Sequence, residues 1–567
     1  MPDDMLFMHR FSITHSLAKR YSRKMTPIMR MLALGLGLAS VAEGWYDETV
    51  KDHTHRKNYV VSEQSRLQLV EQDLELAANL NAYAEQLQKK ISVLRRVAEN
   101  WRRALDEAKG REEEYLSNPL HSFPLIRTLH EDWGPVERLM QQLVGQEQIA
   151  ALELMREHLP GAEDVAEAMW GIFRIVHTHN LEPKDVAEGV LDGIQYRGRL
   201  SALDCQALGK FYFHVADYQT AIKWLTLSQD LMEEQPLEYY EELGATSSGI
   251  TLLLARCLVA SDRFDEAVIL LGGDKTFGNK AYHIVSHFQE HPPQQSINIG
   301  SRGITEKFNR LCRSMSRRKT DGSAAHSKPA RLHCRYNATT TAFLRLAPLR
   351  MEELSLDPYI VLYHNVLSDE EMARLENMST PLLHRARIFD KETKKPKISP
   401  VRSADEVGIP NPKLVTEDIQ LVECIQKRIT DLTGLMLTSM RRIQFLKYGF
   451  GGIYVPHHDF FSVHTPTSRL HGDRIATVIF YLNDVEHGGA TAFPNLDLVV
   501  PTERGAVLFW HNMDGETYDL DYRTLHGACP VIVGTKMVMA GWIYEWDQMF
   551  VKSTYYPPRQ KDYRQFN

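Results

Sequence analysis

The chain has 567 residues, of which 43% are hydrophobic and 25% are charged, and its formal net charge is −7. This length predicts several domains, and the composition is that of globular protein rather than of a disordered or fibrous chain. The mildly acidic balance gives no reason to expect nucleic acid as a partner.

The first 44 residues read as a signal peptide region. Met29 and Arg30 precede a short apolar run at 31–42, which ends in small residues. This pattern is typical of a cleaved secretory signal, and the run is too short to span a bilayer comfortably. A buried helix or a short anchor is the alternative. The signal predicts a luminal compartment, and no other stretch resembles a membrane span.

The six cysteines are few for a secreted chain, so disulfides are not expected to be its main scaffold. Cys312 and Cys334 flank a basic, Ser-rich segment, and a bond between them would close a loop. Asn337 and Asn377 begin glycosylation triplets, which suit a luminal glycoprotein.

Residues 45–180 are expected to form a helical N-terminal dimerisation domain. Between Leu80 and Leu105, apolar residues recur at alternating steps of four and three, the spacing of a coiled-coil seam. The seam has two interpretations: self-association of subunits, or a long helix packed inside its own domain.

Residues 181–287 contain two similar helical pieces, VADYQTAIKWL at 215–225 and ASDRFDEAVIL at 260–270. They follow the pattern of tetratricopeptide-type helical hairpins, which stack into a concave peptide-binding groove. Phe213 and Tyr218 are candidate aromatic contacts with such a peptide.

Residues 288–345 read as a linker, because their composition shifts to Pro, Gln, Ser, Gly and a basic run. From 346 to 550 the segments are rich in β-branched and aromatic residues, and helices are expected at 368–382 and 415–434. The sequence predicts a multidomain α + β chain whose C-terminal domain is a double-stranded β-helix, or jelly roll. A tail follows at 551–567.

The stretch YVPHHDFF carries the candidate metal site. Side chains alternate along a strand, so His457 and Asp459 face one way and His458 the other. A histidine and a carboxylate on one face are two members of a 2-His-1-carboxylate triad, which holds Fe(II) and leaves positions open. The second histidine must come from a distant segment. Five are available: His464, His471, His487, His511 and His526.

His526 is preferred as the second histidine because Lys536 follows ten residues later. Lys536, Val538 and Trp542 share one strand face, and a lysine directed into a barrel needs a buried anion. The far carboxylate of 2-oxoglutarate would be that anion. His511 is the rival, although no basic residue follows it at this spacing. A zinc hydrolase is the other hypothesis for a metal site, but no glutamate beside the candidate ligands stands out as its general base.

Four segments, YGFGGIYVPHHDFF, RIATVIFYLNDVEHGGATAFP, LHGACPVIVGTK and WIYEW, closely resemble the catalytic domain of the collagen prolyl 4-hydroxylase α subunit. The resemblance extends upstream through CRYN, ITDLTGL, RLSALDCQALGKFYFHVADY and NPLHSFPLIRTLHEDW. It covers nearly the whole chain after the leader.

The resemblance implies roles for single residues. It implies three iron ligands, which are His457, Asp459 and His526. It implies binding of the 2-oxoglutarate C5 carboxylate by Lys536, Tyr448 and Thr491. Arg474 and Trp542 match residues that line the peptide channel.

The resemblance also implies an activity and a setting. The activity is hydroxylation of proline at C4 in X-Pro-Gly peptides with 2-oxoglutarate and O₂, giving 4-hydroxyproline, succinate and CO₂. Fe(II) is the metal, and L-ascorbate rescues oxidised iron. The family works in the endoplasmic reticulum lumen as an α2β2 tetramer whose β subunit is protein disulfide isomerase.

The chain departs from the family pattern at several positions. Phe213 stands where the family has a tyrosine, Met537 replaces a tryptophan, and 398–410 has no aromatic residue. No C-terminal cysteine is available to pair with Cys529. Two alternatives therefore stay open: a hydroxylase of non-collagen proline-containing peptides, and a non-catalytic peptide-binding subunit.

Overall fold

The computed structural model describes residues 58–293, 302–321, 332–389, 396–397, 402–409, 415–440, 442–461, 466–514 and 519–548. The predicted signal region and C-terminal tail lie outside these residues. The chain divides into two compact units: one is Ser62–Gly161, and the other joins Met1–Val61 to Ala162–Asn567. No helix among the described residues combines the length and apolar character that a bilayer crossing requires.

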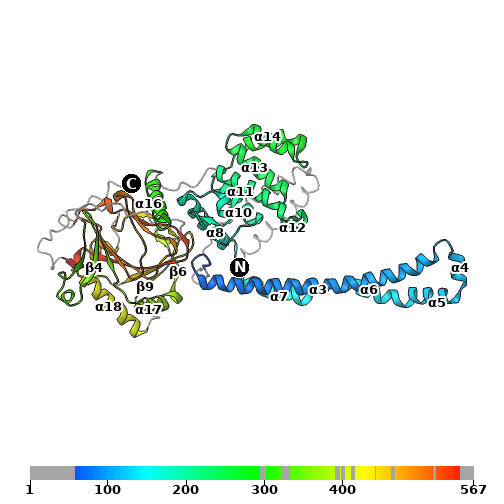
Figure 1. Ribbon diagram of the computed structural model, residues 1–567, viewed down its shortest axis with the longest axis horizontal. Coiled ribbons are helices and arrows are strands. Elements are labelled where there is room, and N and C mark those ends of the chain that lie inside the picture. The colour runs from blue at the N-terminus through cyan, green and yellow to red at the C-terminus, as the bar shows by residue number, and fades with distance from the viewer. Residues whose placement is uncertain are drawn as a thin grey trace, which may run out of the picture. The chain divides into compact units, whose positions relative to one another are not determined.

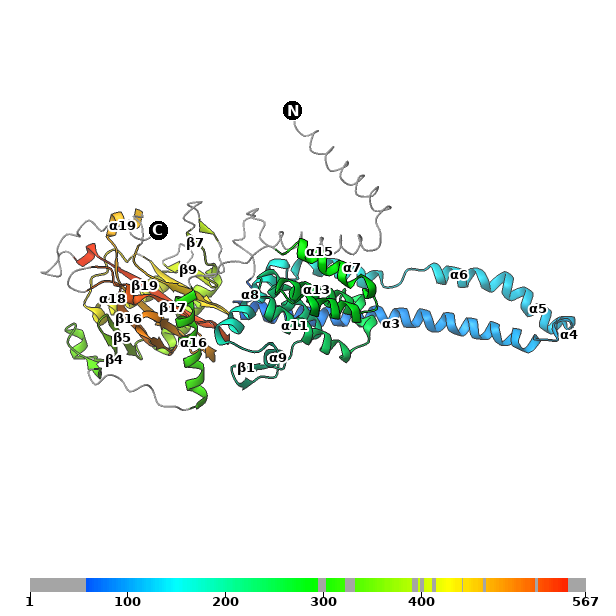
Figure 2. The same cartoon turned by 90° about the horizontal axis from the view of Figure 1, so that it is seen from above.

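The unit Ser62–Gly161 is built on one long helix, α3 (Glu63–Ala108). Ser62 caps it, because its hydroxyl accepts a hydrogen bond from the Ser65 N–H at 3.1 Å. Four shorter helices follow, and the last two return along α3 (Figure 2): α4 (Glu112–Ser117), α5 (Pro119–Arg127), α6 (Trp133–Gln141) and α7 (Gln146–Met155). Trp101 and Trp133 pack with ring centroids 5.6 Å apart. The prediction of a helical N-terminal region is confirmed.

Several apolar side chains of α3 stay exposed in the single chain. Leu67 and Leu74 are 61% and 66% exposed, and Leu80 and Leu105 of the predicted seam are 68% and 61% exposed. Packing inside the unit therefore covers only part of the seam. An exposed row of large apolar residues is a common feature of association surfaces.

Residues 162–290 form a helical domain that belongs to the larger unit (Figure 1). Its helices are α8 (Ala162–His179), α9 (Pro183–Ala187), α10 (Ala202–His214), α11 (Tyr218–Leu231), α12 (Leu237–Glu242), α13 (Ser247–Ala260), α14 (Phe264–Gly273) and α15 (Ala281–Glu290). A hairpin of β1 (Val190–Leu191) and β2 (Ile194–Gln195) follows α9.

The two sequence-similar pieces of this domain have the same local structure. Each contains a turn residue with a left-handed backbone, Ala216 (φ 58°) or Asp262 (φ 59°), and continues as α11 or α14. Helix α10 packs against α11, α11 against α13, and α13 against α14. Trp224 and Leu225 of α11 are fully buried in the resulting core.

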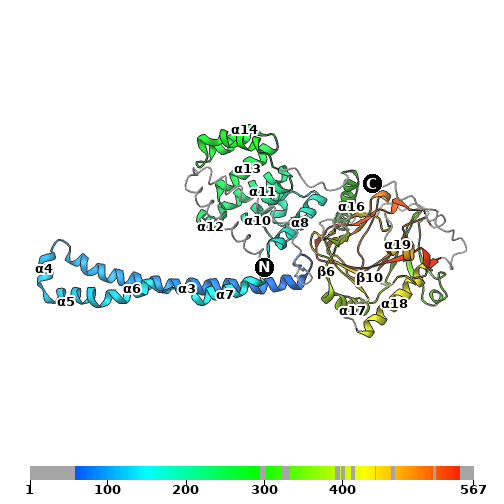
Figure 3. The same ribbon diagram turned by 180° about the vertical axis from the view of Figure 1, so that it is seen from behind.

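The C-terminal domain contains two antiparallel sheets (Figure 3). The larger has nine strands, in the order β3 (Cys334–Asn337), β4 (Leu349–Leu356), β5 (Tyr359–His364), β16 (Val507–His511), β12 (Arg474–Tyr481), β19 (Lys536–Tyr544), β10 (Ile443–Tyr448), β9 (Asp405–Ile409) and β6 (His384–Arg385). The smaller has four, in the order β11 (Tyr454–His457), β17 (His526–Ala528), β14 (Thr491–Phe493) and β15 (Leu498–Val500).

Two strand pairs complete the domain: β13 (His487–Gly488) with β18 (Val531–Val533), and β7 (Ile388–Phe389) with β8 (Pro396–Lys397). Phe493 of the small sheet meets Trp510 of the large sheet edge to face, with ring centroids 5.4 Å apart. Both rings lie in a buried cluster that joins the two sheets.

Helices cover the other face of the large sheet. Helices α17 (Asp369–Ser379) and α18 (Thr416–Thr433) contribute Leu375 and Ile425 to a buried cluster with Phe445 of β10. The two helices lie side by side (Figure 3). The prediction of a β-rich domain with helices at these two places is therefore confirmed. A short helix, α19 (Pro466–His471), precedes β12.

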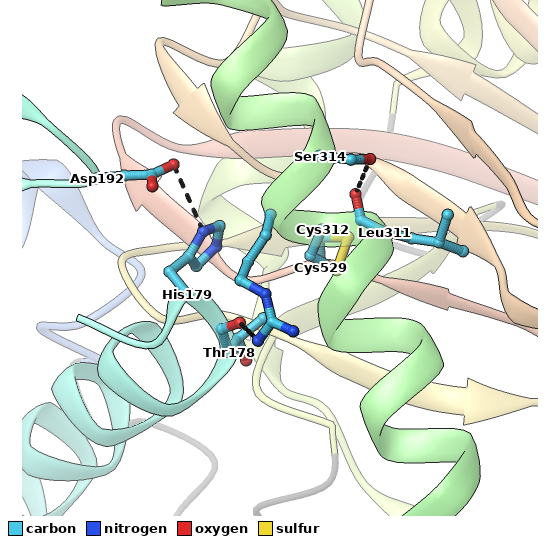
Figure 4. Close-up of a disulfide and its surroundings, with 8 residues drawn as sticks. Thr178, His179, Asp192, Leu311, Cys312, Ser314 and Cys529 are labelled. Atoms are coloured by element: carbon cyan, nitrogen blue, oxygen red, sulfur yellow. Dashed lines mark hydrogen bonds and ion pairs between the residues drawn. A yellow bond between two sulfur atoms is a disulfide. The ribbon is translucent and has the colours of Figure 1, made fainter. Parts of the chain in front are cut away.

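Helix α16 (Arg302–Asp321) lies within the segment predicted to be a linker, and it carries a disulfide (Figure 4). Cys312 is bonded to Cys529, whereas Cys334 on the edge strand β3 is a free, exposed thiol. The predicted Cys312–Cys334 bond is therefore wrong. The reason is packing, since Phe308 and Cys312 are buried against Ala492 and Cys529 at the small sheet.

The helical domain is joined to the β domain through Glu167 of α8. Its carboxylate accepts hydrogen bonds from Arg174 (2.9 Å) and the Ser403 hydroxyl (2.6 Å), and it pairs with Arg385 at 2.9 Å. Although burial alone would raise the pKa of Glu167, the two guanidinium groups and Ser403 lower it to about 2.

The two candidate glycosylation sites differ in accessibility. Asn337 is only 7% exposed, and its amide nitrogen donates to the Tyr363 hydroxyl and to the Leu432 carbonyl. The fold is incompatible with a glycan at Asn337, a fact that the triplet alone does not reveal. Asn377, at the end of α17, is exposed.

Candidate active site

The structure brings His457, Asp459 and His526 together. His457 ends β11 and pairs directly with His526, the first residue of the antiparallel strand β17. The distance from His457 Nε2 to one carboxylate oxygen of Asp459 is 3.7 Å, and that from His526 Nε2 to the other is 3.5 Å. One ligand atom from each residue lies within 4.8 Å of the other two. This donor set fits the predicted facial triad.

Backbone carbonyls orient both imidazoles. His457 Nδ1 donates to the Val455 carbonyl at 2.9 Å, and His526 Nδ1 donates to the Thr524 carbonyl at 3.0 Å. A carbonyl can only accept, so each ring carries its proton on Nδ1 and offers a free Nε2. Burial and the neighbouring His526 hold the pKa of His457 well below its ordinary value, which favours the neutral ligand form.

A chain of side chains fixes the Asp459 carboxylate. Thr477 Oγ1 donates to Asp459 Oδ2 at 2.7 Å, and Asn512 Nδ2 donates to the same threonine oxygen at 2.9 Å. Burial alone would raise the pKa of Asp459, but His526 and His457 outweigh it and the net shift is downward. The carboxylate is therefore held charged.

The other candidate histidines do not join the triad, although His458 also lines the cavity. His458 stacks on Phe460 at 4.6 Å, and His511 lies beside Phe509 and Tyr359. His487 Nε2 lies 3.5 Å from Asp192. None of them joins the three-residue cluster, and His464 lies outside the described residues.

Lys536 is buried in the same cavity. It is 3% exposed and pairs in register with Tyr448 of β10. Its ammonium lies 5.8 Å from the Tyr448 ring centroid and 5.6 Å from that of Tyr481. No carboxylate pairs with it among the described residues, and burial lowers its pKa to about 7. A buried amine without a counter-charge makes this end of the cavity an anion site.

Tyr481 supports this end of the cavity, and the sequence analysis missed it. Its hydroxyl lies 2.8 Å from Thr491 Oγ1. Tyr481 lies an even number of residues from Thr477 in β12, so strand alternation places both on the cavity face. That alternation is the signal that could have found it.

The cavity has a volume of about 260 Å³ and contains the triad, Lys536, Tyr448 and Thr491. Arg474 and Trp542 also line it. The Arg474 guanidinium lies 4.0 Å from the Trp542 ring centroid and 4.6 Å from that of Phe461. Stacking of this kind fixes the guanidinium plane at the wall of the cavity.

The predicted peptide contacts Phe213 and Tyr218 are not in this cavity. They lie in the helical domain with ring centroids 5.7 Å apart. Phe213 is 6% exposed, and the Arg256 guanidinium lies 5.0 Å from its ring centroid. Their role in peptide binding stays a prediction.

Two family models match parts of this chain. Residues 443–544 match the model of the 2OG-Fe(II) oxygenase superfamily, and residues 62–193 match that of the prolyl 4-hydroxylase alpha-subunit, N-terminal region. A viral collagen prolyl hydroxylase from Paramecium Bursaria Chlorella virus-1, a solved structure, is 22% identical with a TM-score of 0.26, and covers 33% of this chain and 95% of its own.

The β domain and its triad thus define an oxygenase that depends on Fe(II) and 2-oxoglutarate. Human prolyl 4-hydroxylase subunit alpha-3 is 31% identical over 477 residues, which cover 77% of this chain and 83% of the human protein. Rat prolyl 4-hydroxylase subunit alpha-1 is 29% identical over 507 residues, which cover 85% and 92%. The chain belongs to the prolyl 4-hydroxylase alpha-subunit family.

Proposed function

We propose that the chain is the catalytic α subunit of a procollagen-proline 4-dioxygenase. It hydroxylates proline at C4 in X-Pro-Gly peptides and converts 2-oxoglutarate and O₂ to succinate and CO₂. The observation that carries the proposal is the presence of His457, Asp459 and His526 in one cavity with the unpaired amine of Lys536.

The donor set fits Fe(II), because two neutral imidazoles and a charged carboxylate on one face leave the remaining positions open. Iron held there supplies the redox chemistry that couples decarboxylation of 2-oxoglutarate to oxidation of a C–H bond. The contacts of His457, His526 and Asp459 with Val455, Thr524 and Thr477 hold the ligands in place before the metal arrives. L-Ascorbate would return oxidised iron to the ferrous state.

Lys536 binds the C5 carboxylate of 2-oxoglutarate, with Tyr448 and Thr491 beside it. The carboxylate supplies the counter-charge that the buried amine lacks, so binding favours the protonated lysine. The Tyr481 hydroxyl holds Thr491 in place through their 2.8 Å contact. This anchor orients the co-substrate toward the triad.

Arg474 and Trp542 bind the peptide where they line the cavity. In the double-stranded β-helix that we assign to the domain, they lie on neighbouring strands, β12 and β19. An extended polyproline II segment suits such a site, because it is already ordered and loses little entropy on binding. A stacked guanidinium also donates to peptide carbonyls in a fixed direction.

The helical domain would hold a longer stretch of the same peptide. The paired helices α10–α11 and α13–α14 have equivalent turns, as expected of tetratricopeptide-like repeats. Phe213 and Tyr218 are the proposed aromatic contacts. The divisions predicted from the sequence are 45–180 for dimerisation, 181–287 for peptide binding, 288–345 as linker and 346–550 for catalysis. In the structure, α8 packs into the helical domain, and 288–345 contains α16 and the edge strand β3.

The proposed assembly is an α2β2 tetramer with protein disulfide isomerase as the β subunit, in the endoplasmic reticulum lumen. The exposed leucines of α3 support an association surface, because each of Leu67, Leu74, Leu80 and Leu105 is at least 61% exposed in the single chain. The names of the relatives, which are subunits, support a complex.

Of the two alternatives left open by the departures from the family pattern, a hydroxylase of non-collagen peptides is favoured over a non-catalytic subunit. Met537 is 1% exposed and belongs to the buried cluster beneath α17 and α18, so its change does not alter the cavity. Phe213 lies under Arg256 in the helical domain. A preference for non-collagen peptides would therefore arise from peptide binding in the helical domain and not from a change in the catalytic residues. The intact triad and Lys536 argue against a non-catalytic subunit.

The test is turnover by the full chain co-expressed with protein disulfide isomerase. The protein meets Fe(II), ascorbate, 2-oxoglutarate and either a Pro-Pro-Gly repeat or an unrelated proline-rich peptide. We expect succinate together with a peptide that has gained one oxygen at C4 of proline. The proposal is overturned if neither succinate nor hydroxylated peptide forms with either of these peptides. Turnover with the unrelated peptide alone supports the non-collagen hydroxylase.

A further inference from the structure

A second group of metal-binding side chains lies in the helical domain, outside the active site. His287, Glu290 and His291 stand at the end of α15, at relative positions i, i+3 and i+4. Residues at this spacing share one face of a helix. One ligand atom from each lies within 4.8 Å of the other two, and the two imidazole centroids are 4.5 Å apart.

The opposite face of α15 anchors this cluster. Ala281, Val285 and Phe288 are buried in an apolar cluster with residues of α13 and α14. The helix that carries the three side chains is therefore fixed in place, while Glu290 and His291 are exposed and His287 is partly buried. A metal ion reaches the cluster directly from solvent.

A hydrogen bond prepares one of the ligands. His291 Nδ1 donates to the carbonyl oxygen of His287 at 3.1 Å. Because a carbonyl only accepts, the neutral ring carries its proton on Nδ1 and leaves the lone pair of Nε2 for a metal ion. The Glu290 carboxylate is exposed and offers one ligand oxygen to the cluster.

We propose that His287, Glu290 and His291 form a second metal site, selective for Zn²⁺ and similar transition-metal cations. Two imidazoles and one carboxylate suit such cations, whereas Ca²⁺ and Mg²⁺ prefer all-oxygen sites. Metal–ligand bonds of about 2.1 Å need ligand atoms roughly 3–4 Å apart, so a bound ion would draw the three side chains slightly closer together. The bound ion joins residues four apart and so fixes the last turn of α15.

The experiment counts bound metal in the full chain. Chelator-treated protein is titrated with Zn²⁺ and the equivalents bound are measured by calorimetry and elemental analysis. The variant His287→Ala/His291→Ala is expected to bind one equivalent fewer than wild type, and Gln289→Ala, on the same turn, the same number as wild type. His457→Ala/Asp459→Ala is expected to lose a different equivalent, and combining both pairs to lose two.

A spectroscopic readout separates metal binding from folding. In the His457→Ala/Asp459→Ala background, Cu²⁺ at the proposed site is expected to show nitrogen couplings by electron paramagnetic resonance. His291→Gln, a milder change, is expected to remove one nitrogen. An unchanged Zn²⁺ count in His287→Ala/His291→Ala, or an equal loss in Gln289→Ala, overturns the proposal. Neither outcome depends on hydroxylase turnover.

Discussion

His457 and His526 face each other across the β11–β17 pair, in direct register and with ring centroids 4.5 Å apart. Each ring donates its Nδ1 proton to the carbonyl of the residue two positions earlier in its own segment. Both Nε2 atoms consequently point at Asp459. Backbone carbonyls two residues before each histidine thus orient both imidazoles, while Thr477 fixes the carboxylate between them.

The assignment of the second histidine can be tested against its rival. His526→Ala is expected to lower turnover by several orders of magnitude, because two ligands do not hold Fe(II) in a facial triad. His511→Gln serves as the matched control and is expected to retain turnover. Succinate release at saturating Fe(II) is the measurement. Loss of activity in the His511 variant with an active His526 variant would reverse the assignment.

Lys536 predicts a pH dependence of 2-oxoglutarate binding. Its amine has a pKa of about 7 in the free protein because it is buried. It is charged below that pH and neutral above it, so affinity for the dicarboxylate is expected to fall as pH rises beyond 7. The dissociation constant would be measured without O₂ between pH 6 and pH 9.

Two variants isolate the contribution of that charge. Lys536→Ala is expected to weaken 2-oxoglutarate binding about 10–100-fold at pH 6.5, the cost of one charge-assisted contact. Lys536→Arg is expected to flatten the pH profile, because a guanidinium stays charged throughout. A wild-type profile that does not change across pH 7 would contradict the assigned role.

Thr477 is expected to act on metal affinity through Asp459. Thr477→Val keeps the side-chain shape but removes the hydroxyl that donates to the carboxylate. Loss of such a supporting contact lowers metal affinity about 10–100-fold. The Fe(II) concentration for half-maximal turnover should rise accordingly, and Thr477→Ser should restore it. Equal behaviour of the valine and serine variants would exclude this role.

Much of the site was predictable because its signals are local. Strand alternation separates His457 and Asp459 from His458, and the Lys536 position follows from the same period in β19. The ten-residue spacing to Lys536 favoured His526 over His511, but only the pairing of β11 with β17 places His526 beside His457. Strand alternation could also have found Tyr481, whereas Asn512 acts on Thr477, 35 residues away in the sequence, so no local pattern marked it.

Burial and long-range packing account for the wrong expectations. The triplet at Asn337 carries no information on its amide, which is used inside the fold. Nearness in sequence favoured Cys334 as the partner of Cys312. The amphipathic face of α16 instead places Cys312 against a residue 217 positions away.

Glu167 is expected to make stability depend on pH. Its pKa falls from 4.5 to about 2 on folding, so its contribution is present above pH 4.5 and is lost as pH decreases toward 2. Glu167→Gln should lower the free energy of unfolding by about 2–3 kcal/mol at pH 7. The difference from wild type should narrow below pH 4.5, as measured by urea unfolding.

An exposed ion pair provides the control for this prediction. Glu182 pairs with Lys223 at 2.7 Å, but both side chains are more than half exposed. Glu182→Gln is therefore expected to change the free energy of unfolding by less than about 1 kcal/mol. If both variants behaved alike, the contacts of Glu167 with Arg174, Arg385 and Ser403 would not stabilise the junction.

The Cys312–Cys529 bond ties α16 to the end of strand β17, three residues after His526. Replacing both cysteines by serine removes a cross-link over a long loop and is expected to destabilise the β domain by about 2–5 kcal/mol. Cys334→Ser, at a free and exposed thiol, is expected to leave the unfolding transition unchanged. Thermal unfolding measures both effects, and mapping of unreduced peptides identifies the linkage. A Cys312–Cys334 peptide in the wild-type digest would show that α16 is not bonded to the small sheet. The strand that carries His526 would then be held against α16 by noncovalent packing alone.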